Sequence, residues 1–234
     1  MKKIALSLPI MIPSLLLSAP ALSQQGFYSE LYAGSVKNKA EIDGSLTNSV
    51  TYLGNTETTT QSYSDTQSYD STSLGLRLGY QFNEYIAIEA GYHNYGKAKD
   101  NYIDEFDDTI NEKISSSAVS FGIKGSLSIS DHFSIFARTG MAKWDFKASV
   151  TDSSMPGEVE KLKESDKDIY YGIGAEYRFN ETISLGVEYS VLSMGWKDVE
   201  SEYEQYYDVD YSYSLDRKVD YKVQNIALLL KISF

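Results

Sequence analysis

The sequence contains no cysteine and only two histidines, and each shortage removes a class of function. Without cysteine, the chain is neither a disulfide-stapled scaffold nor an enzyme with a catalytic thiol. Histidine is the commonest general base in catalysis, so two histidines leave little material for a hydrolytic site. The carboxylate-rich segments also lack the spacing of a calcium-binding loop. We therefore expect no catalytic residue, no metal site and no cofactor.

Basic residues are outnumbered, with 21 Lys and Arg against 33 Asp and Glu and a formal net charge of −12. The first 23 residues hold two lysines and no acid, so the rest of the chain carries −14. Binding to nucleic acid requires a basic surface. We therefore expect no nucleic-acid partner.

A long apolar run occurs only at the N-terminus, where a basic start precedes Ile4–Leu17 and small residues follow to Ser23. These are the three regions of a secretory signal peptide. We expect residues 1–23 to be removed, with cleavage after Ser23 or after Ala21, leaving residues 24–234 as one domain. A retained helical anchor is the alternative, but the run is short and broken by two prolines. No later stretch approaches the ~18 apolar residues of a spanning helix.

Apolar residues after position 24 recur with period two, the period of a β-strand, and not with the period of a helix. Each such segment is long enough to cross a bilayer at the usual tilt. One face of each segment is large and apolar, and the other carries Gly, Ser and charge. The eight segments are Phe27–Val36, Thr72–Phe82, Tyr85–Tyr95, Ser117–Ile129, Phe133 to about Phe146, Ile169–Phe179, Thr182–Val191 and Val219–Phe234.

The connections between these segments alternate between short and long. The short ones are Asn83-Glu84, Ser130-Asp131-His132 and Asn180-Glu181. The long ones are about Lys37–Ser71, Gly96–Ser116, Lys147–Asp168 and Leu192–Lys218. Short turns at one end and long loops at the other are typical of transmembrane barrels, with the turns periplasmic and the loops extracellular. The aromatic run Tyr206–Tyr213 could continue the barrel wall above the membrane.

The pattern predicts an all-β fold, a closed eight-stranded antiparallel transmembrane β-barrel with short periplasmic turns and long extracellular loops. Period two alone does not say which face is inside. A soluble, secreted barrel that binds an apolar ligand alternates in the same way but points its apolar side chains inward. That reading stays open as a remote alternative.

The last segment ends in an aromatic residue preceded by apolar residues at alternate positions. These residues are Phe234, Ile232, Leu230, Leu228 and Ile226. This ending resembles the C-terminal assembly signal of outer-membrane proteins. The resemblance implies that the barrel assembly machinery reads it while the last strand is inserted.

Short local motifs extend the resemblance over residues 24–234. They include Leu31-Tyr32-Ala33-Gly34, Leu78-Gly79-Tyr80-Gln81-Phe82 and Gly174-Ala175-Glu176-Tyr177. The chain is similar to the eight-stranded outer-membrane barrel family that includes the membrane domain of outer membrane protein A and the X-type and opacity-type barrels. It shows no peptidoglycan-binding domain, so cell-wall anchoring does not carry over.

The small-residue face carries four acids and five bases at mid-strand. They are Glu30, Arg77, Glu89, Lys124, Arg138, Glu176, Arg178, Glu188 and Lys231. A charge facing lipid at mid-depth costs about 2–4 kcal/mol, so we expect all nine to face the lumen and pair there. The expected centre of this network consists of Glu89, Lys124, Arg138 and Glu176. Such a network is either structural filling of the lumen or the gate of a small pore.

Two functions follow from this interpretation. The first is a structural or surface-interaction role, in which the barrel supports membrane integrity and its acidic, tyrosine-rich loops bind a protein, a glycan or cations beside lipopolysaccharide. The second is a narrow gated pore for small solutes. In either case we expect a monomer in the outer membrane, exported through its signal peptide, with outer-membrane lipid and lipopolysaccharide as partners.

Overall fold

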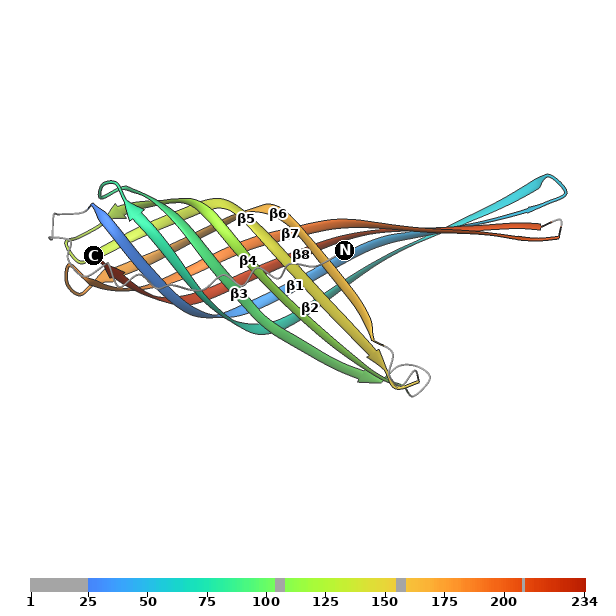
Figure 1. Ribbon diagram of the computed structural model, residues 1–234, viewed down its shortest axis with the longest axis horizontal. Helices are drawn as coiled ribbons and strands as arrows, with labels where there is room; N and C mark the ends of the chain where they lie inside the picture. The colour runs from blue at the N-terminus through green and yellow to red at the C-terminus, as the bar shows by residue number, and fades with distance from the viewer. Residues whose placement is uncertain (1–24, 104–107, 155–158, 208) are drawn as a thin grey trace, which may run out of the picture.

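The computed structural model describes residues 25–103, 108–154, 159–207 and 209–234. Eight strands form a closed barrel in which each strand pairs antiparallel with its sequence neighbours and the last closes on the first (Figure 1). The strands are β1 (Gly26–Tyr52), β2 (Asn55–Gln81), β3 (Ile86–Ile103), β4 (Thr109–Ser128), β5 (Phe133–Asp152), β6 (Glu160–Arg178), β7 (Ile183–Tyr206) and β8 (Val209–Ser233). In the described part of the chain, no helix has the length and apolarity needed to cross a membrane. The predicted fold class is confirmed.

The apolar face of the barrel points outward. On β2, Leu74 and Leu78 are 66% and 56% exposed, whereas Arg77 between them is 2% exposed. The same alternation holds on β8, where Leu228 is exposed and Leu229 is buried. An apolar exterior around a filled interior is the reverse of a soluble ligand-binding barrel, so that alternative does not hold.

Three tight turns join the strands at the base of the barrel, as the sequence predicts. The Asn83 side-chain oxygen accepts hydrogen bonds from the backbone of Tyr85 and Ile86, both at 2.9 Å. Asn180 does the same for Thr182 and Ile183 at 2.9 and 2.7 Å. An Asn side chain that satisfies backbone donors two and three residues on stabilises a turn.

The strands at the opposite end are much longer than the hydrophobic alternation predicts. The expected long connection between β1 and β2 is nearly all strand, paired without a break to Tyr52 and Asn55, and only Leu53 and Gly54 form the turn. Both turn residues have positive φ, 48° and 79°, which suits a two-residue hairpin. Outside a bilayer both faces of a sheet are wet, so the backbone pairing continues where the hydrophobic alternation stops.

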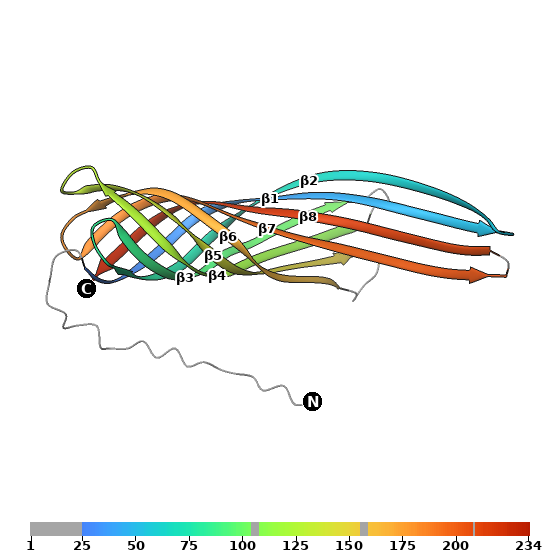
Figure 2. The same ribbon diagram turned by 90° about the horizontal axis from the view of Figure 1, so that it is seen from above.

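The barrel divides into two sheets above the level of Leu74 and Leu192. Pairing of β2 with β3 ends at Leu74↔Asn94, and pairing of β6 with β7 ends at Tyr170↔Leu192. The longer sheet, here called the arm, comprises residues 37–52, 55–73, 193–206 and 209–224. The shorter sheet, here called the flap, comprises residues 97–103, 109–117, 143–152 and 160–169. Figures 1 and 2 show the two sheets diverging from the common base.

A β-bulge in β3 marks one side of this division. The register with β4 shifts between Asn94 and Lys97, and Gly96 between them has a φ of 78°. A Cβ on Gly96 would lie 2.2 Å from the carbonyl oxygen of Thr72. The position therefore requires glycine, both for its backbone conformation and for the close approach of β2.

Candidate functional site

Eight of the nine charged residues predicted to face the lumen lie inside the barrel and form ion pairs with one another. They comprise four acids and four bases, so their formal charges cancel. The ninth, Arg178, is half-buried at the base end of β6, where its backbone N–H donates to the His132 carbonyl. Among the described residues it has no ion-pair partner.

Two arginines bridge two glutamates in the middle layer of the lumen. Arg77 lies 2.5 Å from Glu30 and 2.7 Å from Glu188. Arg138 lies 2.9 Å from Glu30, 3.0 Å from Glu188 and 3.5 Å from Glu89. All five side chains are at most 3% exposed. This alternation of positive and negative groups compensates charges that have been removed from water.

A second cluster lies nearer the base. Glu176 accepts hydrogen bonds from Lys124 at 2.9 Å and from Lys231 at 3.2 Å. The four residues expected to form one centre are therefore divided: Arg138 and Glu89 belong to the middle layer, and Lys124 and Glu176 to the basal cluster. Strand stagger sets this division, because it decides which inward positions share a level.

Aromatic rings and hydroxyls fill the space between the charges. Arg77 lies over the Tyr32 ring at 4.6 Å, and Lys124 over the Phe136 ring at 4.4 Å. The Tyr28 hydroxyl donates to Glu89 at 2.6 Å. Cation–π contacts and charge-assisted hydrogen bonds are strongest where water is excluded, so the layer is a packed polar core.

A layer of buried apolar side chains, which the sequence analysis missed, lies in the lumen above the charges. Its buried members are Val36, Ala40, Tyr95, Ala98, Ile114, Ala118, Ala142, Trp144, Phe146, Tyr170, Leu192, Met194, Tyr221 and Val223. Phe146 packs on Trp196 and on Tyr221 with ring centroids 4.9 Å apart in each case. We call this layer the apolar plug. The sequence could have predicted the plug, because every second residue of a strand points into the lumen. On β5, counting from the inward Arg138 in steps of two reaches Trp144.

Little free space remains between the two layers. A cavity of about 10 Å³ is lined by residues that include Arg77, His93 and Asn225, which is room for about one water molecule. His93 is buried there, with its two ring nitrogens 2.6 Å from the Tyr32 and Ser120 hydroxyls. The charge network and the apolar plug thus fill this part of the lumen with packed side chains.

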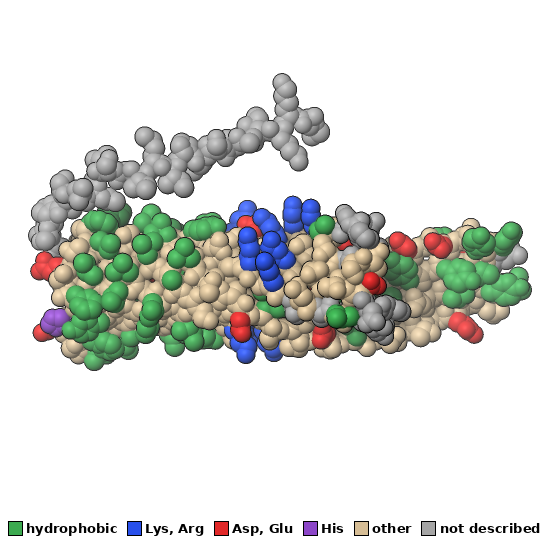
Figure 3. Space-filling model, turned by 90° about the horizontal axis from the view of Figure 1, so that it is seen from below, with side chains coloured by type: hydrophobic (Ala, Val, Ile, Leu, Met, Phe, Trp, Pro, Cys, Tyr) green, Lys and Arg blue, Asp and Glu red, His purple; other side chains and the backbone are tan. Residues whose placement is uncertain are grey.

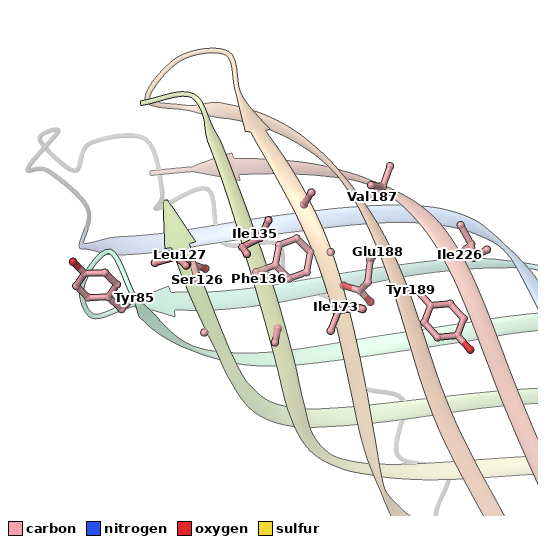
Figure 4. A pocket seen from close by; sticks show the side chains of 14 residues that line it. Tyr85, Ser126, Leu127, Ile135, Phe136, Ile173, Val187, Glu188, Tyr189 and Ile226 are labelled. Atoms are coloured by element: carbon pink, nitrogen blue, oxygen red, sulfur yellow. The ribbon is translucent and has the colours of Figure 1, made fainter. Parts of the chain in front are cut away.

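A depression lies on the outer, apolar side of the barrel base. It has a volume of about 870 Å³, and Figure 4 shows Leu127, Ile135, Ile173, Val187 and Ile226 around it. Small residues such as Ala137 and Ala175 make it concave. Its position within the apolar exterior makes it part of the surface that faces lipid.

The lumen-side face of the arm carries a row of apolar and aromatic side chains along its two central strands. On β1 and β8 these are Leu46, Val50, Tyr52, Val209, Tyr211, Tyr213 and Leu215. At the end of the arm Tyr206 and Tyr207 are 70% and 91% exposed. Large apolar groups this exposed, far beyond the lipid-facing band, are typical of interaction surfaces.

Acidic residues of β7 border this row. Asp198, Glu200, Glu202 and Glu204 occupy successive positions on the same face. Arg217 of β8 donates to Asp198 at 2.7 Å and to Glu200 at 2.9 Å, and the hydrogen bond to Asp198 raises the pKa of Arg217. Glu202 and Glu204 make no ion pair within the described residues, so this edge is left with net negative charge.

No group of three or more His, Asp and Glu side chains in the described ranges is arranged to hold a metal ion. Of the two histidines, His93 is enclosed in the lumen, and His132 stacks on Tyr177 beside the turn after β4, with ring centroids 6.0 Å apart. They lie on different levels of the barrel and do not form a common site.

Comparison with known proteins gives one family match. Residues 10–210 match the outer membrane protein beta-barrel domain family. No curated protein sequence matches the chain.

Among solved structures, three similar chains share 13% identity with this one. OprG of Pseudomonas aeruginosa has a TM-score of 0.47, with 89% of this chain and 97% of that chain covered. The outer membrane protease OmpT of Escherichia coli has a TM-score of 0.45, with 91% and 98% covered. Ail, the attachment invasion locus protein of Yersinia pestis, has a TM-score of 0.35, with 80% and 98% covered.

Proposed function

The chain belongs to the outer membrane protein β-barrel domain family, and from that premise we propose that it is a non-conducting anchor that presents the arm to an extracellular partner. The observation that carries this proposal is the arm itself. It continues four strands of the barrel without a break and ends in exposed tyrosines. A rigid sheet joined to a membrane anchor holds its end at a fixed distance from the surface.

The partner we propose is a protein. Tyrosine is enriched at protein interfaces, and the row of apolar residues on β1 and β8 offers an apolar centre. The unpaired acids Glu202 and Glu204 favour a partner with basic residues at the rim of the contact. A glycan partner would depend less on the apolar row and more on the hydroxyl groups of β2.

The test shortens the arm at a level where the register permits it. Gln61, Leu46, Leu215 and Glu200 lie side by side in one row. Replacing residues 46–61 and 200–215 each by Asn-Gly therefore removes the end of the arm and leaves two hairpins in register. Cells displaying this variant should lose adhesion to immobilised protein surfaces such as collagen and mucin, while the barrel remains folded.

A matched control keeps the arm at full length and changes its chemistry. Tyr52→Ser, Tyr206→Ser and Tyr207→Ser remove exposed rings without altering the pairing. Equal adhesion by the intact, shortened and tyrosine-free proteins on every surface would exclude the proposal.

The pore alternative is weaker on geometry. A conducting path would have to cross the Arg77–Arg138 layer and then the apolar plug, and both are packed. We propose that the purified barrel shows no reproducible conductance in planar bilayers. A stable conductance that Glu30→Gln alters would favour the gated pore instead.

We propose no catalysis, because His93 is enclosed and His132 lies in a basal turn.

We also propose that residues 1–23, which lie outside the described residues, form the cleaved signal peptide. Phe234 would be read by the barrel assembly machinery. Its backbone N–H donates to the Phe27 carbonyl at 2.9 Å, and Leu228 and Leu230 face outward beside it. Deleting Phe234 should slow insertion of the barrel into the outer membrane. Recovery of the intact protein in the soluble or inner-membrane fraction would contradict the proposed location.

A further inference from the structure

Lysine is distributed unevenly over the barrel. Apart from the two at the N-terminus and the lumen residues Lys124 and Lys231, every lysine occupies an outward position beyond the apolar exterior. These thirteen are Lys37, Lys39, Lys97, Lys99, Lys113, Lys143, Lys147, Lys161, Lys163, Lys167, Lys197, Lys218 and Lys222. Figure 3 shows basic side chains gathered between the apolar base and the arm.

The flap holds eight of these lysines on its outer face. The strand register arranges most of them in two adjacent rows, Lys99–Lys113–Ser149–Lys161 and Lys97–Ser115–Lys147–Lys163. Asp145 is the one acid at an outward position among the described residues of the flap. The acids of β6, such as Glu164 and Asp166, occupy positions on the opposite face. The outer face of the flap is therefore strongly basic although the whole chain is acidic.

Several of these lysines stand directly opposite one another. Lys99 pairs with Lys113, Lys147 with Lys163, and Lys143 with Lys167. Like charges directly opposite on one face of a sheet destabilise it. None of the flap lysines forms an ion pair with another described side chain. The arrangement is thus unfavourable in the isolated protein and favourable beside an external anion.

The depth of this surface identifies the anion. On β5 the outward residues Ile135, Ala137, Thr139 and Met141 lead directly to Lys143. On β6, Ile173, Tyr171 and Ile169 lead directly to Lys167. The apolar run corresponds to the hydrocarbon layer, so the first lysines meet the headgroups of the outer leaflet. Further from the hydrocarbon layer come the exposed side chains of Lys113, Lys147 and Lys163. Lys147 and Lys163 are the second outward residues beyond Lys143 and Lys167, and Lys113 is the third outward residue beyond Val119.

We propose that the outer face of the flap binds the phosphate groups of a phosphorylated glycolipid of the outer leaflet. Neighbouring strands lie about 4.8 Å apart and alternate residues about 6.8 Å apart. The six lysines of the two rows therefore cover roughly 14 by 7 Å, an area that accommodates more than one phosphate. Ser115 and Ser149 add hydroxyl donors between them. The ammonium groups replace the divalent cations that otherwise separate adjacent phosphates. The proposal requires only the outer-membrane position and is independent of what the arm binds.

The test uses the full-length barrel in detergent micelles with EDTA present. Bisphosphorylated lipid A and fully dephosphorylated lipid A are titrated in parallel. The patch variant is Lys147→Ser with Lys163→Ser. The matched control is Lys197→Ser with Lys218→Ser, a second cross-strand lysine pair that lies on the arm. Heat-dependent gel mobility confirms that each protein is folded.

We expect the intact barrel and the control to prefer the phosphorylated lipid, and the patch variant to bind it at least about tenfold more weakly. Each lysine at an anionic membrane surface contributes roughly a fivefold factor. Equal binding of both lipids, or equal loss in the patch variant and the control, would overturn the proposal. So would tighter binding of inorganic polyphosphate than of lipid A, because the anion would then come from solution.

Discussion

The base of the barrel and the flap differ in where their charged side chains lie. In the base, four acids and four bases lie inside, buried and paired within 3.5 Å. In the flap, eight lysines lie outside, and the acids of β6 occupy the other face of the same sheet. The difference follows from the solvent on the outer side. Lipid around the base excludes charge from the exterior, whereas headgroups around the flap attract positive charge.

The comparison indicates that the depth of a charged residue in the membrane decides whether its partner lies inside or outside the protein. A charge in the base needs a partner within the protein, because burial has removed most of its contact with water. A charge on the flap has its partner outside the protein. Substitutions in the two regions should therefore differ in size, and those in the flap should depend on the surrounding lipid and salt.

The largest effect is expected for Arg138→Leu. Arg138 contacts Glu30, Glu89 and Glu188. Its loss leaves the buried Glu89 without an ion-pair partner among the described residues, and it leaves Arg77 alone to compensate Glu30 and Glu188. The free energy of unfolding in lipid vesicles, measured by urea titration, should fall by about 3–5 kcal/mol. Lys143→Ser, on the same strand but outside, serves as the control. A similar small loss for both variants would mean that the buried network does not hold the base together.

Trp144→Ala should lower the free energy of unfolding slightly less than Arg138→Leu does. The ring is fully buried in the apolar plug and donates to Asp168 at 2.8 Å. Its removal should lower the free energy of unfolding by about 3 kcal/mol, at the low end for tryptophan, because Phe146 and Trp196 can move into part of the space. The charge layer below remains, so planar-bilayer recordings should stay silent. A steady conductance in this variant would show that the plug alone closes the lumen.

Gly96→Val tests the point where the flap leaves the arm. A side chain there meets the Thr72 carbonyl, and the backbone has positive φ. We expect a loss of about 1–3 kcal/mol, accompanied by faster proteolysis in the flap than in the base. Gly54→Val is the control for backbone strain, because nothing lies within 4 Å of a Cβ at that hairpin turn. Equal proteolysis of flap and base would contradict a local role of the bulge.

The smallest effect has the opposite sign. Lys163→Ser removes one member of the Lys147–Lys163 pair and should stabilise the barrel by about 0.2–1 kcal/mol in uncharged detergent at low salt. The gain should vanish at high salt, where the repulsion is screened. In micelles that contain bisphosphorylated lipid A the same change should destabilise. A loss of stability in uncharged detergent would show that the lysine repulsion is already compensated within the protein.

Much of the base was predictable from the sequence, for a reason that also limits the prediction. Lipid outside and a packed lumen inside impose strict alternation of apolar and polar residues. The sequence alone therefore indicates that Arg77 faces the lumen and that Leu78 faces outward. The same alternation would have predicted Trp144 and Phe146 as lumen residues. Beyond the bilayer this constraint disappears, and the strand ends placed near Val36 and Thr72 fell well short of Tyr52 and Asn55.

The sequence by itself determined the eight strands of the base, their inward and outward faces and the three basal turns, because each depends on residues close together in the chain. Tertiary structure decided which charges meet, since Glu30 reaches Arg138 only through the stagger of the closed barrel. It also decided that two sheets extend above the base and that the lysines of β3, β4, β5 and β6 form one surface. These features depend on strand register, which is set by backbone pairing between segments far apart in sequence and leaves no periodic signal within any one of them.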